Sequence, residues 1–220
     1  MAFAAAVASA SVSAGERGFA GLHLVGHVKL DATGARVTVG PERAWSVTWE
    51  RDAGGGISYR KSLGRSRFLV GVQGGLDSSN TLEGRTVILG PRGVNFSFEK
   101  RGLTVALDGV AGFELGHGVL VFGTLGYATS GLSRGAFAFD VGQPPPPEIV
   151  TNDRIHAVTV GFGVEVRLAP RLHFRIAGTR ESSQTFAAKD FGLSVEDLGA
   201  TTAEIVHSAA QVKLGLVFQF

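Results

Sequence analysis

The end of the chain alternates strictly between two kinds of side chain, and this period of two constrains the fold most. Even-numbered positions are all apolar, and the last is aromatic: Ala210, Val212, Leu214, Leu216, Phe218 and Phe220. Odd-numbered positions carry small, amide or charged residues and one valine: Ala209, Gln211, Lys213, Gly215, Val217 and Gln219. Successive side chains of a β-strand point to opposite faces, so the pattern predicts a strand with one wholly apolar face.

Residues 155–168 and 172–177 repeat this alternation on either side of a tight turn at Ala169-Pro170-Arg171. Folding the chain at the turn places apolar residues opposite each other on one face: Leu168 and Leu172, Val166 and Phe174, Val164 and Ile176. On the other face it places Glu165 opposite Arg175. Cross-strand pairs of like character stabilise a hairpin, so an antiparallel pair is predicted here.

A longer hairpin is predicted from strands at 67–77 and 103–115, with its turn at Gly90-Pro91-Arg92-Gly93. Pairing outward from this turn places apolar groups together: Leu76 opposite Leu107, Val70 opposite Phe113 and Phe68 opposite Leu115. A transmembrane strand needs only about 9–11 residues. The tip of this hairpin is therefore expected to stand out in water.

Three more strands complete a set of eight, at 20–30, 44–59 and 119–128. The first has Leu22, Leu24, Val28 and Leu30 on one face; the second has Trp45, Val47, Trp49, Ile57 and Tyr59. The third is apolar on both faces, so its orientation stays open. Connections alternate in length, with short ones at 60–67, 116–118 and 169–171 and long ones near 31–43, 78–102, 129–154 and 187–207.

Composition agrees with strands rather than membrane-spanning helices. The chain has 32 glycines, which helices tolerate poorly, and no run of about 20 apolar residues. It has no cysteine, which excludes disulfides and thiolate metal sites, and a net charge of +2 gives no reason to expect a nucleic-acid partner.

Even strand number, alternating connection lengths and an apolar outward face together predict a membrane-spanning barrel. The predicted fold is all-β: a closed eight-stranded antiparallel up-and-down transmembrane barrel with short periplasmic turns and long extracellular loops. A closed barrel pairs every backbone group internally, as lipid requires. A soluble ligand-carrying barrel is the alternative, but its polar face would have to serve as surface while being rich in glycine and poor in lysine and glutamate.

The chain resembles small outer-membrane barrels of Gram-negative bacteria of the OmpA, OmpX and opacity type, especially the porin-like surface antigens of alphaproteobacteria. The resemblance covers about 18–220 and rests on RFLVGVQGGLD, GLTVALDGVAGFELGHGVLVFGTLGYATSG, HAVTVGFGVEVRLAPRLHFRIAGTRES and the terminal VKLGLVFQF. It implies location in the bacterial outer membrane. It also implies that the barrel-assembly machinery reads the last strand through Val212, Leu214, Leu216, Phe218 and Phe220. The first two strands depart from the family's usual aromatic and glycine-rich opening.

Residues 1–14 are small and apolar and are predicted to be a signal-peptide remnant, followed by an outer-membrane β-barrel domain at 15–220. No lysine or arginine precedes the apolar stretch, so a short disordered or helical tail is the alternative. Expected partners are outer-membrane lipid, the barrel-assembly machinery, periplasmic chaperones during biogenesis and an extracellular ligand bound through the loops. We expect a monomer.

The motifs of enzymes and cofactor sites are largely missing from the sequence. Gly161-Phe162-Gly163 lies within a strand and precedes no helix, so it is not a nucleotide-binding fingerprint. His23 and His27 are separated by about 13 Å along a strand, too far to ligate one ion. His207-Ser208 suggests a lipid hydrolase, but no acidic partner is evident. No catalytic residue, cofactor or metal is predicted.

The charged residues of the polar face are predicted to point into a narrow lumen: Asp108, Glu114, Glu165, Arg167, Arg175 and Lys213. An eight-stranded barrel is just wide enough for side chains to fill, and unpaired charges there would be costly. A network that plugs the lumen is therefore expected, with a narrow path for water, protons or small solutes as the alternative. The leading hypothesis is a non-enzymatic barrel that exposes its loops for surface interaction or envelope integrity; a porin-like channel and a lipid-directed barrel enzyme are the alternatives.

Overall fold

The computed structural model describes residues 18–39, 42–64, 66–89, 92–116, 118–144, 146–147, 149–187, 190 and 203–220. Almost all of them lie in nine strand segments: β1 Gly21–Val39, β2 Glu42–Ser62, β3 Phe68–Leu89, β4 Arg92–Gly116, β5 Val119–Asp140, β6 Ile149–Ala169, β7 Leu172–Glu181, β8 Gln184–Ala187 and β9 Ala203–Gln219. Among these residues, no helix has the length and apolar character that crossing a membrane would take.

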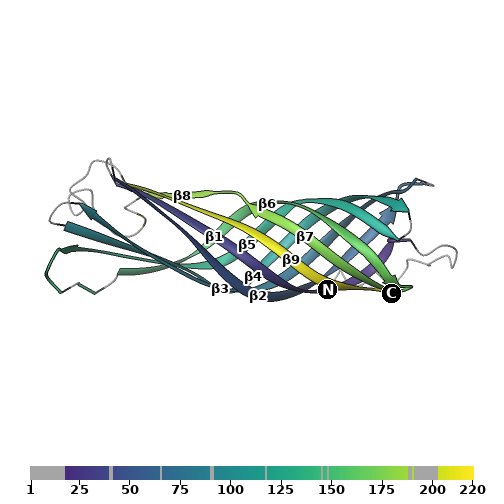
Figure 1. The fold of residues 1–220 in the computed structure, drawn as a ribbon, viewed down its shortest axis with the longest axis horizontal. Helices are drawn as coiled ribbons and strands as arrows, with labels where there is room; N and C mark the ends of the chain where they lie inside the picture. The colour runs from purple at the N-terminus through teal and green to yellow at the C-terminus, as the bar shows by residue number, and fades with distance from the viewer. Residues whose placement is uncertain are drawn as a thin grey trace.

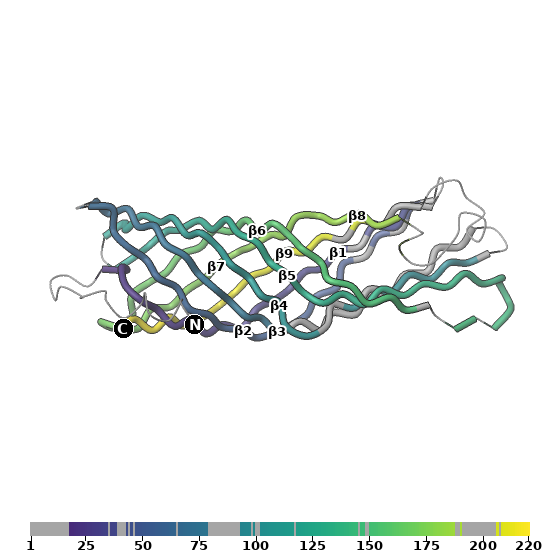
Figure 2. Tube along the Cα trace, turned by 180° about the vertical axis from the view of Figure 1, so that it is seen from behind, coloured from purple at the N-terminus to yellow at the C-terminus, as the bar shows by residue number. Residues whose placement is uncertain are grey.

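The strands close into an antiparallel barrel, because β1 pairs with β9 as well as with β2 (Figure 1). β7 and β8 both pair with the same edge of β9 and together occupy one strand position of the barrel. The barrel therefore has the predicted eight strands. Following the pairs once around the barrel from Leu22 returns to Ala32, ten residues further along β1. This stagger requires strongly tilted strands, which the tube in Figure 2 shows.

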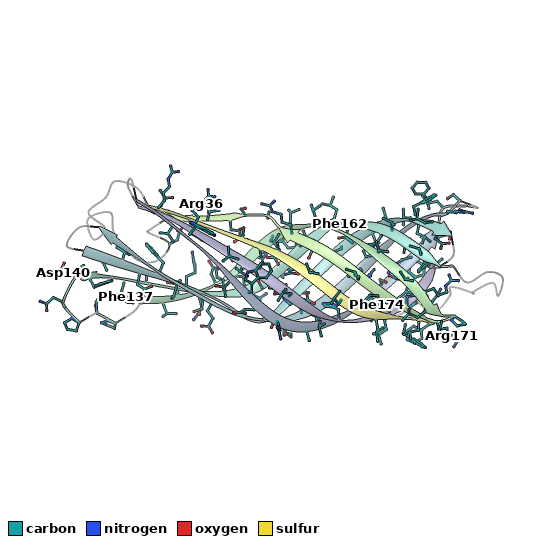
Figure 3. All side chains as sticks on the ribbon, in the orientation of Figure 1. Arg36, Phe137, Asp140, Phe162, Arg171 and Phe174 are labelled. Atoms are coloured by element: carbon teal, nitrogen blue, oxygen red, sulfur yellow. The ribbon has the colours of Figure 1, made fainter. Side chains whose placement is uncertain are left out.

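Alternation divides the wall into an apolar outer face and a mostly polar inner face. On the outer face the large apolar side chains are exposed, including Val158, Val160, Val164 and Phe162, which projects from the wall in Figure 3. The predicted apolar faces of the first and second strands are outward as well. The structure also orients the strand at 119–128, whose Leu120 and Phe122 are buried inside while Val121, Leu125 and Tyr127 face outward.

The predicted register of β6 and β7 is confirmed: Val166 lies opposite Phe174, Val164 opposite Ile176 and Glu165 opposite Arg175. One pair at the turn differs, because Leu172 lies opposite Ala169 rather than Leu168. The register shifts between Arg167 and Ala169, and this irregularity leaves Leu168 without a partner in the ladder. The position of the turn therefore predicted the register of the hairpin correctly, except for the pair next to the turn.

The predicted register of β3 and β4 is wrong by two residues. Phe68 lies opposite Phe113 and Leu76 opposite Val105, and Leu89 pairs with Arg92 at the tip. Only Gly90 and Pro91 thus separate the strands, whereas the prediction centred the turn one residue further along the chain. A shift of two preserves the face of every side chain, so the assignment of outer and inner residues stands.

The long connections at one end of the barrel continue as paired strands rather than as irregular loops. β1 and β2 pair as far as Val39 and Glu42, and β3 and β4 pair to their tip. The predicted connection at 187–207 lies mostly outside the described residues. Beyond the barrel the extensions form two separate groups, one purple and yellow and the other teal and green in Figure 1.

Two ladders end early, and beyond these points the closed barrel continues as two four-stranded sheets. β2 and β3 pair no further than Gly54 and Asp77, and β6 and β7 pair no further than Thr159 and Glu181. The Ser78 hydroxyl marks the first break, where it donates to the Ala53 carbonyl at 2.9 Å. One sheet then has the order β2-β1-β9-β8 and the other β3-β4-β5-β6.

Both sheets carry buried side chains, and a contact between β5 and β8 joins them. Their buried apolar side chains include Val37, Val94, Phe96, Leu132 and Ala136. Arg134 of β5 lies over the Phe186 ring of β8 at 4.9 Å and donates to the Asp153 carboxylate of β6 at 3.1 Å. The extension is therefore a packed structure and not a set of independent hairpins.

Candidate functional site

The part of the lumen nearest the short turns, here called the lower part, is built around Glu165. The side chain of Glu165 is completely buried. Arg60, reaching across the barrel from β2, donates to both carboxylate oxygens at 3.0 and 2.9 Å. His173 Nδ1 lies 2.8 Å from one oxygen, and Arg175 Nε donates to the other at 3.2 Å. The β6–β7 turn brings Glu165 and Arg175 together, and closure of the barrel adds Arg60. A charge this deeply buried is tolerable only with such partners.

A second group lies further along the lumen, around Asp77 of β3. Its carboxylate is 2.8 Å from His27 Nε2 and accepts a hydrogen bond from Lys213 Nζ at 2.6 Å. These three residues come from β3, β1 and β9, and they therefore tie the first strand to the last across the interior. Beyond them, Lys29 forms an ion pair with Asp31 at 2.7 Å.

The space between the two groups is almost filled. Arg175 Nη1 donates to Gln73 Oε1 at 2.7 Å, and its guanidinium lies 4.4 Å from the centre of the Phe122 ring. Asp108 accepts a hydrogen bond from Thr159 at 2.7 Å. The cavity between these residues has a volume of about 40 Å³, room for a few water molecules only.

The mouth of the barrel at the end with the short turns is occupied by Phe19, just before β1. This side chain is 1% exposed, and its ring meets His173 edge-on at 4.8 Å. The Arg167 guanidinium lies 5.2 Å from the ring centre, and the Phe19 N–H donates to Glu114 at 2.8 Å. A Cβ on Gly18 would come within 2.6 Å of the Glu114 carboxylate, so glycine allows this close approach.

All six charged residues predicted for the lumen lie on inward-facing positions of their strands. Asp108, Glu165, Arg175 and Lys213 belong to the hydrogen-bonded groups described above. Glu114 and Arg167 instead hold the segment around Phe19 at the mouth.

Two central partners, Arg60 and His27, are not predicted from the sequence. Arg60 falls in the predicted turn at 60–67, although its even number in β2 places it on the inner face beside Ser58. His27 falls in a predicted strand, but the sequence indicates no partner for it. The alternation in the sequence is enough to place both Arg60 and His27 on the inner face. Only the stagger of the closed barrel brings Arg60 to Glu165 and His27 to Asp77.

The apolar row of the last strand lies on the outer face. Val212, Leu214, Leu216, Phe218 and Phe220 are all exposed there. The Phe220 N–H donates to the Leu22 carbonyl at 3.1 Å, so the row lies at the β9–β1 closure. Reading of this row by the assembly machinery stays a prediction.

Three histidines raise the question of a metal site or an enzyme: His23, His27 and His207. His23 is fully buried, and its ring centre lies 6.1 Å from that of His173. Over the described residues no group of three His, Cys, Asp or Glu is placed to hold a metal ion. The side chain of His207 is outside the described set, so the hydrolase hypothesis based on it is not tested.

A closed antiparallel barrel with lipid-compatible walls defines a class, the integral β-barrels of the bacterial outer membrane. Comparison with family models makes this specific: the model of the outer membrane protein beta-barrel domain matches residues 2–220. The chain belongs to that family, and its location is the bacterial outer membrane. No curated protein matches it.

Comparison with solved structures finds outer-membrane proteins of low sequence identity. The outer membrane protein OprG from Pseudomonas aeruginosa is 9% identical with a TM-score of 0.52, over 91% of this chain and 96% of that one. Ail, the attachment invasion locus protein of Yersinia pestis, is 12% identical with a TM-score of 0.36, over 88% and 98%. The outer membrane protease OmpT from Escherichia coli is 10% identical with a TM-score of 0.45, over 90% and 97%. At these identities the likeness concerns the fold alone.

Proposed function

We propose that the protein is a non-enzymatic outer-membrane barrel with a sealed lumen, whose extracellular sheets make its contacts with other molecules. The observation that carries this proposal is the filled interior. Glu165 and its three partners fill the lumen above Phe19, and the cavity that the described residues enclose above them has a volume of about 40 Å³. A solute would have to displace buried, mutually paired charges.

Energetics support a plug rather than a pore. Removing one partner of a buried ion pair typically costs about 3–5 kcal/mol, because it leaves an uncompensated charge. A conducting path through the lower group would require separating Glu165 from Arg60 and Arg175 together. The polar inner face is therefore interpreted as the core that stabilises the barrel.

The extension beyond the membrane supports a contact role. Phe96 and Leu132 are buried in one of its two sheets, and the Arg134–Phe186 contact joins that sheet to the other. An ordered extension of this kind can present side chains to a ligand without large ordering costs. Within this proposal the protein acts as a monomer in lipid, inserted by the barrel-assembly machinery after delivery by periplasmic chaperones.

Planar-bilayer recording of the full chain tests the sealed lumen. We expect no steady conductance from the wild-type protein. The matched positive control replaces Arg60, Glu165 and Arg175 together by alanine, which empties the lower lumen and should produce measurable current. Steady wild-type current, from protein whose gel mobility shifts on boiling as a folded barrel's does, would favour the narrow channel instead. Hydrolysis of outer-membrane lipid by the purified protein would favour the barrel enzyme.

A further inference from the structure

Both tryptophans of the chain lie on β2, on the outer face of the extension. Trp45 is 73% exposed and Trp49 is 63% exposed, and Val47 between them is exposed as well. Odd positions of β2 face outward, so this row continues the line of Ile57 and Tyr59 on the barrel wall. A row of exposed aromatic side chains beyond the membrane is a candidate contact surface.

The row lies beyond the level where β2 leaves the hydrocarbon. β2 pairs with β3 only from Ser62 to Gly54, which is nine residues and enough for a transmembrane strand. Lipid requires both edges of a strand to be paired, so β2 emerges near Gly54, and Trp49 and Trp45 follow about 16 and 30 Å further along the tilted strand. The two rings thus stand above the hydrocarbon, on the side of the outer-leaflet headgroups.

Small residues form a flat area beside the tryptophans. On β1, Gly34 lies opposite Val47 and Ala32 opposite Trp49. On β9, Ser208 lies opposite Gly34 and Ala210 opposite Ala32. The flat area and the three β2 side chains of the row form one surface, which we call the tryptophan shelf.

Positive charge borders the shelf. Arg36 lies opposite Trp45, and in Figure 3 its side chain projects away from the wall. Arg43 and Arg51 are exposed at the two ends of the β2 row. Over residues 28–38 of β1 and 43–53 of β2, none of the described outward side chains is acidic. Guanidinium groups bind phosphate through paired hydrogen bonds, and the apolar face of a sugar ring packs against an indole ring.

An apolar hollow lies nearer the short turns than the shelf and extends from β1 and β2 across β3 to β4. It has a volume of about 830 Å³ and opens on the outer wall, where Gly26, Gly55 and Gly74 lie among Leu24, Ile57 and Leu107. At this depth only lipid tails or another apolar surface can fill it. A surface for phosphate and sugar on β1 and β2, with a hollow for an acyl chain further down the same two strands, matches an amphiphile that carries both parts.

We propose that the tryptophan shelf with Arg36 and Arg43 binds the phosphorylated sugar headgroup of an outer-leaflet glycolipid, with an acyl chain in the hollow below. This inference rests on the proposed function and names a partner for the extracellular sheets. A second copy of the chain would cover the apolar row and the hollow but would leave the arginines without anions. A glycolipid accounts for all three features, because its sugars can pack on the apolar row, its phosphates can pair with the arginines and its acyl chain can fill the hollow.

Intrinsic fluorescence tests this directly, because Trp45 and Trp49 are the only tryptophans in the chain. The full chain is placed in phosphatidylcholine bilayers, and either lipopolysaccharide or chemically dephosphorylated lipopolysaccharide is added. We expect the phosphorylated form to shift emission to shorter wavelength and to protect it from acrylamide. The dephosphorylated form should do so at about tenfold higher concentration.

Variants assign the effect to the shelf. Arg36→Gln combined with Arg43→Gln should weaken the response to lipopolysaccharide about tenfold. Arg171→Gln, at the opposite end of the barrel in Figure 3, should leave it unchanged. Heat-dependent gel mobility shows that each variant is folded.

Three results would overturn the inference: no emission change, an equal response to both lipids, or a change that depends on protein concentration without lipopolysaccharide. The last would point to a second copy. The sealed lumen is measured by conductance, so failure here leaves the proposed function standing.

Discussion

At the scale of single residues, Glu165 organises the interior, and its removal should be the most damaging change there. Glu165→Ala leaves the guanidiniums of Arg60 and Arg175 buried without a carboxylate, a loss of about 3–5 kcal/mol before lumen water reduces it. Arg175→Ala should cost less, because Arg60 still holds both oxygens. The temperature at which the folded gel band disappears reports both effects.

The double change of Glu165 and Arg175 to alanine should cost less than the sum of the single changes, because the pair is coupled. Arg171→Ala, exposed in the turn, is the matched control and should leave the folded band unaffected. Strictly additive losses in the double-mutant cycle would mean that the two side chains do not meet in the lumen. The sequence predicted this pair because a three-residue turn fixed its register; it could not predict Arg60, which only barrel closure brings near.

At the scale of elements, the last strand, β9, carries the outward apolar row and also closes the barrel by pairing with β1. Phe218→Asp puts a charge on the lipid face, which costs up to a few kcal/mol near the bilayer midplane and less near its edges. Deleting Phe220 removes the hydrogen bond to Leu22. Both variants should accumulate in the periplasm and be degraded, as fractionation and immunoblotting would show. Gln219→Asn, on the inner face, should assemble as the wild type does. Normal outer-membrane amounts of both variants would exclude an assembly role for the row.

Protease accessibility should follow the elements. On intact cells, a protease of broad specificity should cut the exposed segment after β5, around Val141–Gln143, and should spare Ala169-Pro170-Arg171. The paired extensions of β3 and β4 should resist, because backbone groups held in a ladder do not fit a protease cleft. Mass spectrometry of the released peptides locates the cuts. Cutting only at 169–171 would mean that the topology is inverted.

The elements also show where sequence patterns stop being informative. Alternation identified the strands within the lipid because one face there must be apolar. Beyond the lipid this requirement ends: Leu132, Ser133 and Arg134 are consecutive and all buried, since β5 is covered on both faces. Only the turn motif at 90–93 indicated a hairpin that extends beyond the lipid; alternation gave no sign that the other long connections continue as strands. The β3–β4 register failed by two residues because Gly90-Pro91-Arg92-Gly93 allows more than one position for the turn.

At the scale of the whole molecule, closure between β1 and β9 is the central claim, since it turns the polar faces inward and gathers Asp77, His27 and Lys213. The chain has no cysteine, so an introduced pair reports this closure without interference. Val25 lies opposite Val217, and both are buried. With Val25→Cys and Val217→Cys together, a disulfide should form in the oxidising periplasm.

The matched control joins Val25→Cys with Gln219→Cys, because Gln219 lies opposite His23, two residues away. Gel mobility of the unfolded protein, with and without reductant, shows which pair is cross-linked. We expect an efficient disulfide between positions 25 and 217 and little between 25 and 219. A disulfide formed only by the control pair, or by neither pair in folded protein, would contradict the closed barrel and its register.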